Sequence, residues 1–253
     1  MLQTAVLTAL AVLLAQGVAF GQIVELEARY WFIDLNASAK AKSGSLPGTD
    51  IDLGDDLGLK SENAPEGRLT FFAGPNSRIR LAYTRLDFEG DKTLGRTITF
   101  EGETFTANSR VATDLDIQYG RLGWVWEPLG IPGVLKFGGI LEAKGFLIDA
   151  SLKTRGVVPQ ARESATLPLV LPTLGLALDL TPYRTLHLFA EASGLPAGDL
   201  GHIVDAEAGV RFLPLPFFGL SAGYRLLDLR VHDGDDFAKL RLAGPFVGVS
   251  LRF

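Results

Sequence analysis

Apolar and polar residues alternate along most of the chain after residue 22. In the segment 202–213, every even position from 204 to 212 is apolar, while Asp205, Glu207 and Arg211 stand at odd positions. Successive side chains of a β-strand point to opposite faces, so this alternation predicts strands with one apolar and one polar face. Ten such strands are predicted, at residues 23–35, 67–74, 78–88, 111–126, 134–149, 164–180, 185–193, 202–213, 217–230 and 239–253.

The predicted connections alternate in length. Even-numbered strands are followed by short turns, such as 75–76 and 214–216, and odd-numbered strands by longer polar loops, such as 36–64 and 89–110. An even number of strands with short turns at one end and longer loops at the other is typical of outer-membrane barrels. The expected fold is therefore all-β, a transmembrane antiparallel up-and-down β-barrel of ten strands. Eight strands are possible if strands two and three, or six and seven, are wrongly divided.

The alternation changes phase at three places, which are Arg85/Leu86, the stretch from Gly120 to Leu122, and Gly244/Pro245. An extra residue in one strand shifts the faces in this way, so β-bulges are expected there.

The carboxyl-terminal strand carries a further signal. Val247, Val249, Leu251 and Phe253 are apolar at every second position, and the sequence given ends on the aromatic residue. This pattern resembles the assembly signal of bacterial outer-membrane β-barrels, which implies the barrel-assembly machinery as a partner during biogenesis. A soluble β-sandwich would also alternate, but it needs neither this terminus nor the aromatic residues that gather beside the short turns. Those residues are Phe72, Trp124, Trp126, Phe137, Tyr183, Phe212, Phe217, Phe218 and Phe253.

Composition agrees with a barrel. The 253 residues are 47% hydrophobic and 21% charged, yet no apolar run after residue 22 reaches the roughly 20 residues of a membrane-spanning helix. Residues 1–21 are expected to be a secretory signal peptide with cleavage near Gln22, although no lysine or arginine precedes the apolar stretch. The barrel domain is then residues 22–253. The absence of cysteine excludes disulfides and thiolate sites, and a net charge of −5 gives no support to nucleic-acid binding.

The polar faces of the strands predict a charged lumen. Charges in a narrow lumen must be paired or hydrated, so they form either an ion-pair plug or the wall of a narrow pore, and the plug is favoured. The acids assigned to the lumen are Glu25, Glu27, Asp114, Asp116, Glu142, Asp179, Glu191, Asp205 and Glu207. The bases are Arg29, Arg68, Arg78, Arg80, Lys136, Lys144, Arg211, Arg225 and Arg252.

The first long loop is acidic. Asp50, Asp52, Asp55 and Asp56 could offer oxygen ligands to a divalent cation, although their spacing does not complete an EF-hand. The loop resembles one found in uncharacterised outer-membrane barrels, a resemblance that implies location and fold but no activity. No cofactor is expected beyond such a loop-bound cation. Acidic outer loops would meet lipopolysaccharide or external ligands.

An enzyme is the main competing class. Outer-membrane proteases of ten strands place an Asp pair and a His–Asp pair at the outer rim, and this chain has Asp114 with Asp116 and His232 with Asp233. Neighbouring residues on a strand point to opposite faces, so the match is poor and no catalytic residue is assigned. The expected function is an integral, monomeric outer-membrane barrel of a Gram-negative bacterium with a structural or narrow passive-pore role. A selective small-solute or ion channel and an outer-rim hydrolase are the alternatives.

Overall fold

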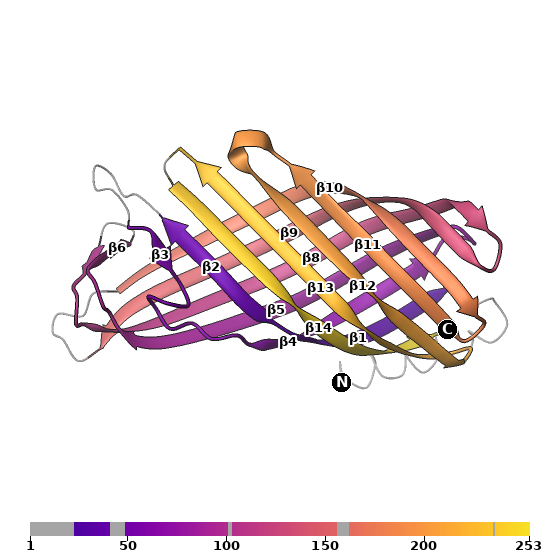
Figure 1. The fold of residues 1–253 in the computed structure, drawn as a ribbon, viewed down its shortest axis with the longest axis horizontal. Helices are drawn as coiled ribbons and strands as arrows, with labels where there is room; N and C mark the ends of the chain where they lie inside the picture. The colour runs from indigo at the N-terminus through magenta and orange to yellow at the C-terminus, as the bar shows by residue number, and fades with distance from the viewer. Residues whose placement is uncertain (1–22, 41–48, 101–102, 156–161, 235) are drawn as a thin grey trace, which may run out of the picture.

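The computed structural model describes residues 23–40, 49–100, 103–155, 162–234 and 236–253. The predicted signal peptide lies outside them. Ten strands form a closed antiparallel barrel, as predicted, because β1 pairs with β14 from Glu25–Arg252 to Trp31–Phe246 (Figure 1). The barrel strands are β1 (Val24–Phe32), β4 (Asn63–Phe72), β5 (Ser77–Thr93), β8 (Arg110–Ile131), β9 (Leu135–Arg155), β10 (Arg162–Tyr183), β11 (Leu186–Pro196), β12 (Gly201–Leu215), β13 (Phe218–Asp233) and β14 (Asp236–Arg252).

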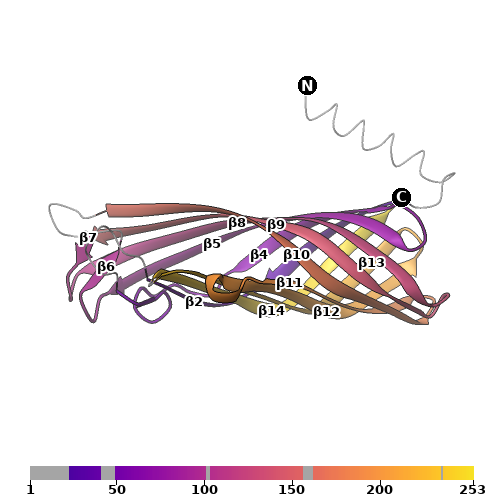
Figure 2. The same ribbon diagram turned by 90° about the horizontal axis from the view of Figure 1, so that it is seen from above.

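The end of the barrel with the short turns is its lower end, and the end with the long connections is its upper end. Four short strands belong to the long connections. β2 (Asp34–Lys40) continues the direction of β1 along β14, and β3 (Ile51–Asp52) pairs with β2. β6 (Ile98–Phe100) and β7 (Glu103–Phe105) form a hairpin at the end of the molecule far from the carboxyl terminus (Figure 2). A single turn of 3-10 helix, η1, spans Gly198–Leu200. None of the helical structure in the described ranges is long and apolar enough to cross a membrane.

An apolar belt surrounds the lower part of the barrel. Leu81, Leu122 and Leu141, on the adjacent strands β5, β8 and β9, are 52%, 55% and 53% exposed. A soluble protein rarely exposes so large a continuous apolar surface, whereas a bilayer covers it. Exposed aromatic residues mark the edge of the belt beside the short turns, among them Trp124, Trp126, Tyr183, Phe212 and Phe217.

Above the belt the polarity of the wall is reversed. On β8 the outward face changes from Leu122 and Trp124 to Asp114 and Asp116, and the inward face carries the buried Leu115 and Ile117 instead. β5 changes in the same way. The long strands therefore leave the lipid and continue into water around an apolar interior.

The three predicted bulges are wrong. Pairing continues without a shift through Arg85–Gln118 and Leu86–Ile117, through Gly120–Gly145, and through Arg225–Gly244. The phase of the alternation changes because the medium outside the wall changes from lipid to water, with no residue inserted. Register shifts occur instead beside short turns, between Trp126 and Leu129, Leu180 and Tyr183, and Phe212 and Leu215.

Candidate functional site: the occluded lumen

A layer of buried ion pairs crosses the lumen inside the apolar belt. Glu207 of β12 accepts hydrogen bonds from Arg29 of β1 at 3.2 Å and from Arg68 of β4 at 2.9 Å. All three side chains are at most 3% exposed. Because β13 and β14 lie between β12 and β1, these contacts span the interior and do not merely join neighbouring strands.

Asp205, two residues before Glu207, completes the layer. Its carboxylate lies 2.9 Å from Arg225 of β13, 3.1 Å from Lys144 of β9 and 3.4 Å from Arg121 of β8. Arg121 and Arg225 also bond to Glu66 of β4. A buried charge without a partner costs several kcal/mol, roughly 3–5. Mutual pairing therefore offsets much of the cost of burying this many charges in the lumen.

An aromatic layer lies against the ion pairs. The guanidinium of Arg29 lies 4.4 Å from the ring centre of Phe246, and that of Arg225 lies 4.7 Å from Trp31. Tyr119 stacks on Phe146 with ring centres 4.3 Å apart, and its hydroxyl donates a 2.7 Å hydrogen bond to Asp205. The rings belong to one buried apolar cluster with Leu86, Leu115, Ile117, Leu227 and Leu242. Two dissimilar layers thus fill the lumen one above the other.

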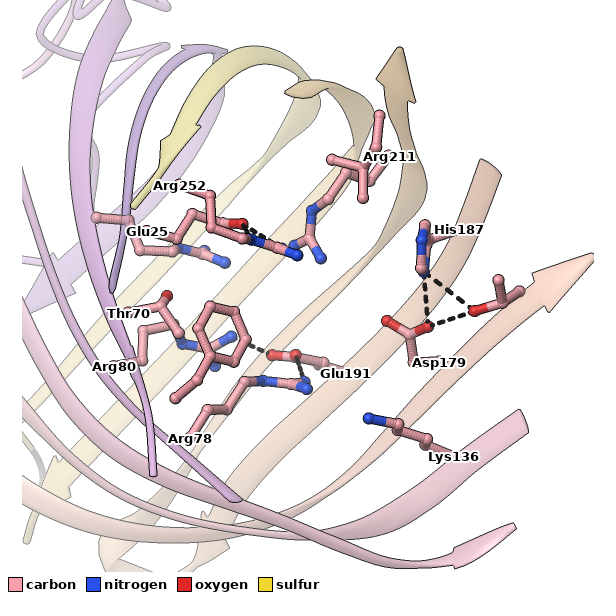
Figure 3. Close-up of a pocket in the computed structure, with 14 residues that line it drawn as sticks. Glu25, Thr70, Arg78, Arg80, Lys136, Asp179, His187, Glu191, Arg211 and Arg252 are labelled. Atoms are coloured by element: carbon pink, nitrogen blue, oxygen red, sulfur yellow. Dashed lines mark hydrogen bonds and ion pairs between the residues drawn. The ribbon is translucent and has the colours of Figure 1, made fainter. Parts of the chain in front are cut away.

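Below the ion pairs, a polar vestibule of about 140 Å³ occupies the end of the barrel near the short turns (Figure 3). Glu191 accepts from Arg78 at 2.9 Å and also binds Arg80, and Glu25 accepts from Arg252 at 2.9 Å. The charges of the vestibule are therefore largely paired on the walls. Asp179, His187, Lys136 and Arg211 also contribute to its lining.

Above the aromatic layer, an apolar cavity of about 130 Å³ lies between β2 and β14 on one side and β8 and β9 on the other. Leu115, Ile148, Ala150 and Leu240 contribute to its wall. A second buried cluster adjoins it and includes Ile51, Leu57 and Leu152 with residues of the outer hairpin. The vestibule and this cavity are thus separated by both filled layers.

Most of the charges assigned to the lumen from the sequence lie on its inner face. These are Glu25, Glu27, Arg29, Arg68, Arg78, Arg80, Lys136, Glu142, Lys144, Asp179, Glu191, Asp205, Glu207, Arg211, Arg225 and Arg252. Asp114 and Asp116 do not, and their assignment was wrong because the polarity of β8 is already reversed at their height. Asp116 pairs with Arg85 and Asp114 lies 3.8 Å from Lys153, all on the outer face.

Sequence reasoning missed Glu66, Arg121 and Glu127, whose side chains are 3–4% exposed. Glu66 and Glu127 stand one residue beyond a predicted strand, and Arg121 lies in the stretch taken for a bulge. Extending the two strands by one residue would have placed Glu66 and Glu127 in the lumen. Keeping the period set by the lipid-facing Leu122, Trp124 and Trp126 would have placed Arg121 there as well.

The acidic loop has a defined geometry. Asp52 accepts a 2.7 Å hydrogen bond from the backbone NH of Asp55, and Asp56 accepts one at 2.6 Å from Arg96. The bond from Arg96 is the largest influence that lowers the pKa of the Asp56 carboxyl below its usual range. Among the residues that the structure describes, no three His, Cys, Asp or Glu side chains gather to hold a metal ion. A cation bound by Asp50, Asp52, Asp55 and Asp56 stays a prediction, with two of these carboxylates already engaged.

The terminal strand lies in the belt. Val247, Val249 and Leu251 face outwards, and the backbone of Phe253 pairs with Val24 through two 2.9 Å hydrogen bonds. The role of these residues as an assembly signal, with the assembly machinery as partner, stays a prediction.

Comparison with known proteins identifies the type of fold. No protein-family model matches the chain, and no curated protein does. Among solved structures, the outer membrane protease OmpT from Escherichia coli is similar, with a TM-score of 0.61 at 8% identity over 91% of this chain and 97% of OmpT. The chain has the fold of a bacterial outer-membrane β-barrel. The translocator domain of the autotransporter NalP from Neisseria meningitidis is more distant, with a TM-score of 0.49 at 12% identity over 99% of this chain and 96% of NalP's.

The fold and the apolar belt together give the location, which is the bacterial outer membrane. The likeness to a protease, at 8% identity, concerns the fold alone. Asp114 and Asp116, the acid pair considered from the sequence, face away from the lumen.

Proposed function

We propose that this protein is a closed outer-membrane barrel with a structural role, monomeric and without enzymatic activity. The observation that carries the proposal is the pair of filled layers, in which Arg29, Arg68 and Glu207 join opposite parts of the wall directly beneath packed aromatic rings. A narrow pore would need a continuous hydrated path between vestibule and outer cavity. Buried, mutually paired charges favour a plug over such a path.

Planar bilayer recording tests this directly. The refolded protein is expected to insert and give no stable conductance steps. Phe189 belongs to the same aromatic layer, with its ring centre 6.5 Å from that of Phe246. A variant that removes both layers at one side of the lumen, Arg29→Ala/Glu207→Ala/Phe189→Ala/Phe246→Ala, is expected to conduct. A matched control with three belt substitutions, Leu81→Ala/Leu122→Ala/Leu141→Ala, should stay silent. Stable nanosiemens-class steps from the unaltered protein would overturn the closed barrel and favour the channel alternative.

We propose that the outer section of the barrel contacts lipopolysaccharide. Asp87, Asp114 and Asp116 support this, because they face outwards just above the apolar belt, at the height expected for the head groups of the outer leaflet. Divalent cations would bridge these carboxylates to lipid phosphates. Lipopolysaccharide is expected to raise the melting temperature of the purified barrel in magnesium, and a chelator should abolish the increase. An increase that survives chelation contradicts cation bridging.

A further inference from the structure

The vestibule carries more positive than negative charge. Six lysine and arginine residues line it, against three aspartate and glutamate residues. Arg68 is engaged in the layer above by Glu207 and Glu66. Glu127, which stands outside the lining, also binds Arg78. An excess of positive charge remains when both are taken into account. Because the surrounding wall is apolar, it concentrates the field of these charges and raises the local concentration of anions.

Arg211 of β12 contributes most clearly to this excess. The register places it between His187 of β11 and Ser221 of β13, neither of which is a carboxylate. Within the part of the chain that the structure describes, its Nε is buried without a hydrogen-bond partner and its guanidinium forms no ion pair. The carboxylates of Glu27 and Asp179 act on it only at longer range. Arg211 is therefore a cation in the lumen with no acid bound to it.

Other donors of the vestibule also lack an acid. Lys136 of β9 is paired in register with Asp179, yet its Nζ donates a 2.6 Å hydrogen bond to the backbone carbonyl of Pro75. The side chain of Arg80 is 5% exposed, and its Nε has no hydrogen-bond partner among the described residues. A buried N–H group without an acceptor is costly, and the oxygen of a bound anion would supply one.

The vestibule is accessible from one side. The ion-pair layer closes it above, whereas the side chains of His187 and Arg252, which line it, are each 22% exposed. Its lower end carries the short turns, which lie on the periplasmic side of outer-membrane barrels. Its volume of about 140 Å³ is several times the roughly 10–15 Å³ that one water molecule requires, so a small hydrated anion fits.

The arginine side chains of the vestibule suit a tetrahedral oxyanion. A guanidinium presents parallel N–H groups that match the oxygens of phosphate, and its charge strengthens each hydrogen bond. Arg211 of β12 and Arg252 of β14 both point into the vestibule (Figure 3). Arg78 of β5 lines another wall. A tetrahedral anion can accept hydrogen bonds from several walls at once, whereas a carboxylate ligand has only two oxygens.

Asp179 adds an acceptor that distinguishes one oxyanion from another. Its Oδ1 lies 3.4 Å from Nδ1 of His187 and 3.5 Å from the hydroxyl of Thr181, and within the described ranges no group donates to its Oδ2. An ionised carboxylate can only accept hydrogen bonds. It therefore repels a fully ionised anion and binds one that still carries a proton on an oxygen. Hydrogen phosphate carries such a proton, and sulfate does not.

From these features we infer that the vestibule binds a hydrogen phosphate ion from the periplasm. Arg211 and Arg252 bind its ionised oxygens, and Oδ2 of Asp179 accepts its proton. The charge of the ion offsets the positive excess of the lining. The site does not depend on whether the lumen conducts, because it lies entirely below the ion-pair layer.

Calorimetric titration of the refolded protein with inorganic phosphate tests the site, at about pH 8 and constant chloride concentration. Phosphate is expected to bind. Sulfate and methyl phosphate are also doubly charged at this pH but carry no proton on an oxygen, so they should bind about tenfold more weakly. Absence of phosphate binding, or equal affinities for the three anions, would overturn the inference.

Two variants separate the roles of the residues. Arg211→Gln should weaken phosphate binding about tenfold, because a charge-assisted hydrogen bond is lost. The barrel should still fold, since no acid loses its partner. Arg241→Gln, on the exposed outward face of β14, is the matched control and should bind phosphate like the wild type. An unchanged affinity in Arg211→Gln would contradict the site.

Asp179→Asn tests the selection of the ion. An amide can donate a hydrogen bond to a fully ionised oxygen, so sulfate should bind more tightly and phosphate more weakly than in the wild type. The ratio of the two affinities should therefore fall about tenfold. An unchanged ratio would show that Asp179 does not read the proton, and the assignment of hydrogen phosphate would fail.

Discussion

At the scale of single residues, charge pairing is the main determinant of the interior. Arg29, Arg68, Arg121 and Arg225 each contact an acid and lie almost fully out of water. Replacing one acid would leave its bases buried without a partner, which costs more than the pair itself contributes. The network therefore specifies which strands must face one another, and its value for net stability is the smaller effect.

The pair of Asp56 and Arg96 in the outer loop has a predictable pH dependence. Because Arg96 lowers the pKa of Asp56 in the folded protein, the pair stabilises the loop above the ordinary Asp value of about 4 and loses this contribution as pH falls through the lowered pKa. Hydrogen exchange of residues 51–59 should show it. In the wild type, the protection of these loop amides relative to amides in the rest of the barrel should fall on acidification. In Arg96→Gln, the relative protection should be about twofold lower at neutral pH and should change less on acidification. Equal acid sensitivity in both proteins would contradict the assignment.

At the scale of elements, the sequence predicts the strands well and their outer ends poorly. Period-two alternation locates β12 almost to the residue, since every inward position from Asp205 to Arg211 is polar or glycine and every outward one is apolar. For β8 the same rule fails above Gly120. Alternation shows which face of a strand is apolar. It identifies the outward face only if it is known whether lipid or water surrounds that part of the barrel. A strand that passes from lipid into water reverses the meaning of the pattern while its geometry stays unchanged.

Contacts between residues distant in the sequence could not be predicted, because alternation describes each strand by itself and not its partners. The prolines of β10 indicate a weakened strand, but that β11 ends at Pro196 and leaves an edge open is a property of the pairing. Likewise, the sequence predicts that Arg29 and Glu207 both face inward. Their contact with each other follows only from the closure of the barrel between β1 and β14. The composition of the candidate site could thus be predicted, and its connections could not.

At the scale of the whole molecule, the barrel has two stacked sections of opposite polarity. The lower section is apolar outside and ionic inside, which suits lipid, and the upper section is charged outside and apolar inside, like an ordinary soluble β-protein. Leu86, Phe88, Leu115 and Ile117 form its core together with the inner faces of β13 and β14. The protein therefore holds a folded apolar core beyond the membrane without a separate domain.

Cysteine scanning along β8 distinguishes this reversal from the bulge that the sequence pattern suggests. The chain has no cysteine, so each introduced thiol is unique. In intact vesicles, Asp116→Cys should react with a membrane-impermeant maleimide, because it faces water above the belt, and Leu122→Cys should react only with a lipid-soluble reagent. Ile117→Cys should react with neither until the protein is unfolded, since Ile117 is 1% exposed in the upper core. A bulge near Gly120 would exchange the outcomes at positions 116 and 117, giving a lipid-accessible Ile117→Cys and a protected Asp116→Cys. The labelling of these two variants therefore decides which residues of β8 face outwards above the belt.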